Sequence, residues 1–272
     1  MIRKFHIYLP FVSAGMQETT TYRVNWIFLI AGNALGCFVS YFIWNAVFLS
    51  SPNDTLNGFT MPQMTIYIFL MFLTSTLIHS GGTYDVAEEI RDGSIAMRIL
   101  KPVSYNSTFF FQELGNKVLT AAILVIPIVL GIAILGMFIW KDLQINILNL
   151  LLYFFSSTLA YLINFFFNIC FGFIAFITKY LWGANMIKNC IVGFLSGAMI
   201  PFSFFPEVVE KILLILPFSS LNYTPVMIYM NVYNGRDILY YLCLQAIWVF
   251  FFWGLSKLLW KTAIKRLSIQ GG

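Results

Sequence analysis

The residue types capable of polar chemistry gather in one stretch of this chain, from Asp85 to Lys101. It reads Asp-Val-Ala-Glu-Glu-Ile-Arg-Asp-Gly-Ser-Ile-Ala-Met-Arg-Ile-Leu-Lys, and Pro102 follows it. Acidic residues come first and basic residues last, which complements a helix dipole. Gly93 followed by Ser94 is typical of one helix ending and the next beginning. We therefore predict two short helices joined by an elbow, which could bind a soluble partner or could be a solvated loop.

No catalytic motif accompanies this stretch. The sequence contains no Gly-x-Ser-x-Gly and no His-Glu-x-x-His, and it lacks the Gly-x-x-x-x-Gly-Lys-Ser/Thr loop that cradles ATP phosphates. The four cysteines and two histidines show no metal-ligand spacing. We expect this chain to hold no catalytic residue, no metal and no cofactor of its own.

The composition shows which solvent surrounds the rest of the chain. Of its 272 residues, 60% are hydrophobic and only 10% are charged, whereas soluble domains are about a quarter charged. A spanning helix needs about 20 apolar residues. Six runs approach or exceed that length: Val24–Leu49, Met61–Ser80, Thr108–Ile139, Ile145–Ile177, Gly183–Ile200 and Ile238–Trp260. We predict an all-α integral membrane protein with six transmembrane helices, forming a single domain over residues 1–272.

The basic residues predict the orientation of these spans. With both termini inside, only Lys141, Lys211 and Arg236 of the 16 Lys and Arg residues would lie outside. Cytoplasmic loops are enriched in Lys and Arg. We therefore expect both termini and the charged stretch in the cytoplasm. The net charge of +5 then reflects topology and contact with anionic membrane lipids, not nucleic acid.

We predict that residues 1–22 form a helix that lies on the membrane surface. Ile2, Phe5, Leu9, Val12 and Met16 form one apolar stripe at helical spacing. The alternative is an irregular cytoplasmic tail.

Two motifs resemble a known family. The run Glu88-Glu89-Ile90-Arg91-Asp92-Gly93-Ser94-Ile95-Ala96-Met97-Arg98-Ile99-Leu100-Lys101-Pro102-Val103-Ser104-Tyr105 is similar to the cytoplasmic loop of type-2 ABC transporter permeases. A second match is Leu216-Pro217-Phe218-Ser219-Ser220-Leu221-Asn222-Tyr223-Thr224-Pro225-Val226. The likeness extends over most of the chain and is to a less characterised, bacterial branch of exporters.

The resemblance implies a permease that dimerises and docks a cytoplasmic ABC ATPase dimer. ATP and Mg would bind to those ATPase subunits. Within the loop 81–107, residues 84–100 would form the coupling helix region. The implied docking residues are Tyr84, Asp85, Glu88, Glu89, Ile90, Arg91, Asp92, Gly93 and Arg98.

Two glycine pairs point to a permease dimer. Gly32 and Gly36 lie in the first run, and Gly193 and Gly197 lie in the fifth. Each pair would place small residues on one helix face and permit close approach of a second helix. These glycines could instead pack within one chain. The second permease is expected to be a paralogue rather than an identical copy.

Prolines interrupt the apolar sequence in residues 201–236, before the last run. As in the family, this segment would be a re-entrant pair of half-helices that closes the external end of a pathway, with Pro201, Pro206, Glu207 and Pro217 at the gate. Non-helical backbone at membrane depth persists only where protein or a water-filled cavity covers it. The alternative is a loop that rests on the outer leaflet.

These observations together predict the permease subunit of an ABC exporter in the bacterial cytoplasmic membrane. Because no charged cavity is evident, we expect a hydrophobic or amphipathic substrate. A scaffold or sensor subunit that binds a cytoplasmic partner without transport is the alternative function. An integral membrane enzyme acting on lipids would need a cluster of polar catalytic groups, which the sequence lacks.

Overall fold

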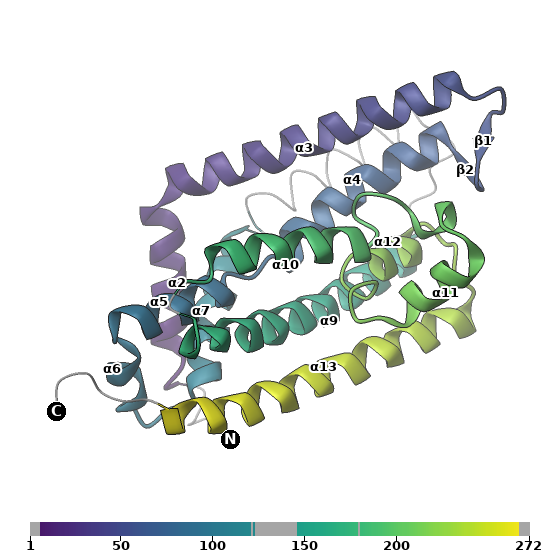
Figure 1. Cartoon of the computed structure of the whole chain (residues 1–272). Coiled ribbons are helices and arrows are strands. Elements are labelled where there is room, and N and C mark those ends of the chain that lie inside the picture. Colours follow the sequence, from purple (N-terminus) through teal and green to yellow (C-terminus); the bar gives the residue numbers. More distant parts are fainter. Residues whose placement is uncertain (1–5, 121, 123–145, 179, 267–272) are drawn as a thin grey trace.

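Long helices dominate the computed structural model, which describes residues 6–120, 122, 146–178 and 180–266. They run lengthwise beside one another (Figure 1): α3 (Arg23–Ser50), α4 (Met61–Ile78), α9 (Ile147–Gly172), α10 (Trp182–Leu195) and α13 (Gly235–Ala263). Their apolar side chains face outward as well as inward, as expected for helices in lipid. Phe28 and Phe42 on α3, for example, are 72% and 64% exposed.

Four candidate membrane spans occur among the described residues: Ala31–Ser50, Met61–Asp92, Ile147–Phe176 and Gly235–Ala263. They correspond to the first, second, fourth and sixth predicted runs. An all-α, multi-pass membrane fold is therefore confirmed.

The other two predicted runs are only partly visible as helices. The third run, Thr108–Ile139, begins within α7 (Tyr105–Thr120), and its residues 123–139 lie outside the described residues. The fifth run, Gly183–Ile200, contains α10, whose 14 residues span about 21 Å at a rise of about 1.5 Å per residue. That length is less than the hydrocarbon thickness of about 30 Å.

Short elements gather at one end of the long helices, which we call the elbow end. There α2 (Leu9–Thr21) crosses the direction of the spans, and α5 (Gly82–Asp92) and α6 (Ile95–Ile99) lie beside it (Figure 1). The last turn of α13 and η4 (Ile264–Arg266) reach the same end. The segment before α3, the stretch before α7 and the C-terminal turn are thus brought together although they are far apart in sequence.

The opposite end holds a small hairpin and the proline-rich segment. Strands β1 (Thr55–Leu56) and β2 (Phe59–Thr60) pair antiparallel across a turn at Asn57 and Gly58, both of which have positive φ as such a turn requires. The proline-rich segment forms η3 (Phe202–Phe204), α11 (Glu207–Ile215) and α12 (Tyr223–Tyr229).

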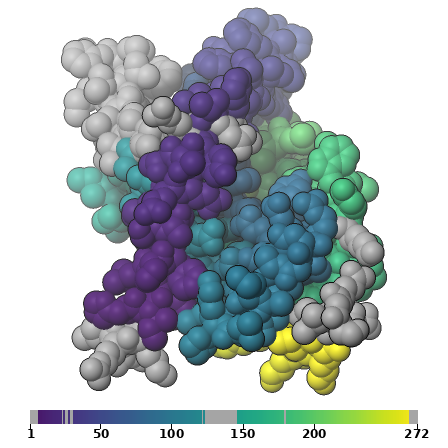
Figure 2. Space-filling view, turned by 90° about the vertical axis from the view of Figure 1, so that its left-hand side faces the viewer, coloured from purple at the N-terminus to yellow at the C-terminus, as the bar shows by residue number. Residues whose placement is uncertain are grey.

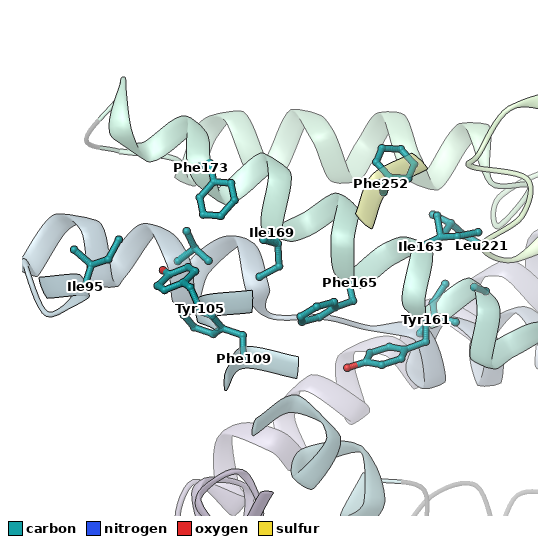
Figure 3. Packing of buried hydrophobic residues seen from close by; sticks show 13 residues of the cluster. Ile95, Tyr105, Phe109, Tyr161, Ile163, Phe165, Ile169, Phe173, Leu221 and Phe252 are labelled. Atoms are coloured by element: carbon teal, nitrogen blue, oxygen red, sulfur yellow. The ribbon is translucent and has the colours of Figure 1, made fainter. Parts of the chain in front are cut away.

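Two aromatic-rich clusters form most of the core. The one near the elbow end joins α5, α6, α7 and α9, with η2 (Phe173–Phe176) continuing α9, and extends to Phe252 on α13 (Figure 3). The other lies near the opposite end, where α4 packs with α12 around Met64, Tyr67 and Val226. The first cluster anchors the elbow to the spans.

Candidate functional site

The charged stretch folds as the predicted pair of helices, which we call the elbow (α5, Gly93, Ser94 and α6). Gly93 has φ +80°, a left-handed conformation in which glycine is unstrained. The Asp92 Oδ1 atom accepts a hydrogen bond of 2.9 Å from the Ser94 N–H. This bond satisfies one of the free N–H groups at the start of α6.

The inward face of the elbow packs tightly against α9. Val86 is fully buried and Ile95 is 2% exposed. A Cβ atom built on Gly172 would lie 2.8 Å from the Val86 Cβ atom, so any larger residue at position 172 would push α5 away. Ile90 packs at the edge of the same cluster.

Glu89 and Arg98 form an ion pair that joins α5 to α6. Their side chains are only 15% and 16% exposed. The Arg98 Nη1 atom also donates to Thr108 Oγ1 at 2.8 Å, and the guanidinium lies 4.0 Å from the centroid of the Phe109 ring. This arginine therefore connects both helices of the elbow to α7.

Tyr105 links the same ion pair to α13. Its hydroxyl donates to the Glu89 carboxylate at 3.4 Å, and its ring stacks on Trp260 with centroids 4.1 Å apart. Burial, together with the negative charge of Glu89, raises the pKa of Tyr105, so the phenol keeps its proton and stays a donor.

The outward face of the elbow combines charged and apolar side chains. Of the predicted docking residues, Tyr84, Glu88, Arg91, Asp92 and Gly93 are exposed, whereas Asp85 is half-buried. Figure 2 views the molecule from this end and shows the elbow as a continuous surface beside α2. The sequence did not single out Met97 and Leu100, which are 71% and 83% exposed on this surface.

A buried polar cluster ties α5 to α9 and α10. The Lys188 Nζ atom donates to Thr83 Oγ1 at 3.1 Å and to Asn168 Oδ1, and Thr83 donates to Asn168 Oδ1 at 2.8 Å. All three residues are buried. Asn168 and Asn164, which donates to the Ile78 carbonyl, thus join helices through hydrogen bonds.

A polar cavity of about 400 Å³ lies next to the elbow, between α2, α3, α4 and α7. Glu18, Asp85, Glu113 and Lys117 are among the residues that line it. The expectation of a hydrophobic or amphipathic substrate rested on the lack of an evident charged cavity, and the structure shows that such a cavity exists. The sequence could not reveal it, because its residues come from five separate helices: α2, α3, α4, α5 and α7.

Hydroxyl groups hold the carboxylate of Glu113 in this cavity. Ser80 donates to its Oε1 atom at 2.8 Å and Tyr161 donates to its Oε2 atom at 3.1 Å. The Lys117 Nζ atom donates to the Thr76 carbonyl at 3.3 Å. The cavity thus has an acidic group on α7 that is held by Ser80, just after α4, and by Tyr161 on α9.

The predicted dimer glycines fall into two different environments. A Cβ atom on Gly32, Gly36 or Gly193 would meet nothing within 4 Å among the described residues. Gly197 differs, because α10 ends at Leu195 and Gly197 is buried with φ +77°. Gly193 and Gly197 therefore do not share a helix face.

The predicted gate residues are also divided by burial. Pro201 and Pro217 are buried, whereas Pro206 and Glu207 are exposed. Glu207 pairs with Lys211 one turn later on α11. After Pro217 the chain turns inward, and α12 is buried against α4 and α9 except for its last residue.

Comparison with known proteins agrees with this architecture. The family model described as ABC-2 family transporter protein matches residues 34–271, which is most of the chain. No curated protein and no solved structure matches the chain significantly. The matched region includes the four candidate spans almost completely, the elbow and the proline-rich segment. The chain therefore belongs to the ABC-2 family of membrane transporter proteins.

Proposed function

We propose that this chain is the permease subunit of an ATP-driven exporter in the bacterial cytoplasmic membrane, and that separate ATPase subunits dock on the elbow. The observation that carries this proposal is the division of the elbow into two faces. Its outward face exposes charged and apolar side chains together, while its inward face is anchored in the spans. An element built in this way can receive a push from a soluble partner and pass it on.

The outward face suits a protein partner more than water alone. Leu100 and Met97 would fill an apolar groove on the ATPase, and the exposed Glu88 and Arg91 would pair with charges around that groove. ATP and Mg would bind to the ATPase, because this chain has no phosphate-binding loop.

The buried contacts offer two routes from the elbow into the spans. Movement of α6 would shift Arg98, and with it Glu89 and Tyr105, which contact α7 and α13. Movement of α5 would act on α9 and α10 through the cluster of Thr83, Asn168 and Lys188. Both routes consist of close-packed side chains, which transmit displacement rather than absorb it.

The second permease would pack on the outer faces of α3 and α10. These faces carry the open glycines at positions 32, 36 and 193, and small residues allow helix backbones to approach in a membrane. We propose a paralogue as the second copy, with both termini of each chain in the cytoplasm.

The substrate would be an amphipathic compound. Its polar group would enter the cavity lined by Glu113 and Lys117, and its apolar part would follow the aromatic helices. Closure of the ATPase dimer would then open the pathway toward the outside.

Affinity purification of the tagged full-length chain from its native membrane tests the docking proposal. We expect a soluble P-loop ATPase to co-purify, identified by mass spectrometry, and the complex to hydrolyse ATP. Leu100→Asp should reduce the recovered ATPase at least about tenfold, because burying a carboxylate in an apolar interface is unfavourable.

Val208→Asp is the matched control. Val208 is also strongly exposed, at 70%, but lies on α11 at the opposite end. ATPase recovery with this variant should equal that of the wild type. Equal loss with both variants would contradict docking on the elbow, and recovery of a partner without ATPase activity would favour the scaffold or sensor function instead.

A further inference from the structure

A second cavity lies at the elbow end, between the start of α7, the middle of α9 and the end of α13. Its volume is about 510 Å³. Phe110, Phe166, Trp253 and Trp260 form much of its wall. We call it the aromatic pocket. No step proposed above uses it.

The charges around the aromatic pocket are positive. Arg98, Lys257 and Lys261 line it, and no acidic residue is among the described residues that do so. Glu89 balances the charge of Arg98, but both lysines are exposed. The Lys257 Nζ atom lies 3.4 Å from the centroid of the Trp253 ring, directly beside the aromatic wall. The pocket thus offers two cations next to a large apolar surface.

An acceptor in the same pocket lacks a partner. The Oδ1 atom of Asn106 is buried and has no hydrogen bond within the described part of the chain. The Nδ2 atom of this side chain donates to Ser256 Oγ at 3.1 Å, which fixes the amide on α13. A buried acceptor is destabilising unless a donor reaches it. A ligand with a hydroxyl group would supply that donor.

We propose that the aromatic pocket binds an anionic glycerophospholipid with a hydroxylated headgroup, such as phosphatidylglycerol. Lys257 and Lys261 bind its phosphate, and a headgroup hydroxyl donates to Asn106. An acyl chain lies against Phe110 and Phe166. Basic pockets between spanning helices bind anionic headgroups in this way. The lipid comes from the leaflet at the elbow end, which is the cytoplasmic leaflet if the proposed orientation holds.

A bound lipid would contact the elbow directly. Arg98 and Tyr105 line the aromatic pocket, and both also hold Glu89. Occupancy would therefore support the contacts that anchor α6 to α7 and α13. The lipid site does not depend on an ATPase, so it can be tested on the isolated chain.

Titration of the delipidated full-length chain, followed by native mass spectrometry, tests the proposal. We expect phosphatidylglycerol to bind at least about tenfold more tightly than phosphatidylcholine with the same acyl chains. Inorganic phosphate, which lacks the acyl chain, should neither bind nor compete. The double variant Lys257→Gln/Lys261→Gln should lose about tenfold in affinity for phosphatidylglycerol, since each cation near a headgroup contributes favourably.

Two further variants localise the site. Lys265→Gln removes an exposed cation from the same end of the chain that does not line the pocket, and it should change the affinity by less than about twofold. Asn106→Leu keeps a similar size but removes the acceptor for the headgroup hydroxyl, so it should weaken binding of phosphatidylglycerol and leave binding of phosphatidylcholine, which lacks that hydroxyl, unchanged. Equal affinity for the two lipids, competition by inorganic phosphate, or equal effects of the lysine variants and Lys265→Gln would overturn the proposal.

Discussion

Gly15 on α2 and Gly115 on α7 each face the backbone of the other helix. A Cβ atom on Gly15 would lie 2.0 Å from the Gln112 carbonyl oxygen, and one on Gly115 would lie 2.1 Å from that of Val12. The two helices therefore cross in backbone contact. Thr19 donates to Asn116 Oδ1 at 2.8 Å beside the crossing. This contact attaches α2 to the helix that begins directly after the elbow.

Substituting Gly115 by Ala should separate α2 from α7. The added methyl group would overlap a carbonyl oxygen, and overpacking of this kind costs about 1–3 kcal/mol. Thermal unfolding of the purified chain should show a lower Tm, and α2 should become more sensitive to protease. Gly254→Ala on α13 is the control, because a Cβ atom there meets nothing within 4 Å. An unchanged Tm for Gly115→Ala would contradict the crossing.

Substituting Glu89 by Gln should destabilise the chain in the absence of any partner. Arg98 would keep a largely buried charge without its counter-ion, and breaking such a pair costs about 3 kcal/mol. The neighbouring Glu88 is exposed, and its bridge to Arg91 lies at the surface. Glu88→Gln should therefore change the free energy of unfolding by less than about 0.5 kcal/mol. Equal Tm shifts for the two variants would argue against an inward role for Glu89.

Gly193 and Gly197 should respond differently to larger side chains. Gly193→Leu should weaken pairing of permeases, seen as a smaller mass by light scattering in detergent, without lowering the Tm. Gly197→Ala should lower the Tm by an amount corresponding to about 1–3 kcal/mol, because φ is positive and the Cβ atom would lie 2.9 Å from the Tyr223 ring. An undisturbed pair in Gly193→Leu would place the interface elsewhere.

Removing the carboxylate of Glu113 should destabilise the polar cavity. Glu113→Leu would leave the hydroxyls of Ser80 and Tyr161 without their acceptor. Each unsatisfied group lowers the free energy of unfolding by about 1–3 kcal/mol. Glu113→Gln keeps an acceptor oxygen and should lower the Tm much less. Similar Tm values for the two variants would show that these hydrogen bonds contribute little.

Local sequence alone determined that the long helices of this protein lie in lipid, and it determined the form of the elbow. Continuous apolar runs can satisfy their backbone in lipid only as helices, so α3, α4, α9 and α13 follow from composition and length. The elbow follows from Gly93 together with Ser94, since glycine followed by a capping residue is typical of one helix ending and the next beginning.

The tertiary structure decided which neighbouring residues face inward. Glu88 and Glu89 are adjacent and identical in type, yet only Glu89 reaches Arg98, because that arginine lies on a second helix whose direction the turn at Gly93 determines. Similarly, α10 ends at Leu195, so Gly193 lies on this helix and Gly197 lies beyond it. The aromatic pocket combines side chains as distant in sequence as Arg98 and Ile264, and Asn106 beside it bonds to Ser256, 150 positions further along. Spacing within one helix carries no information about such distances, which depend on how the helices pack.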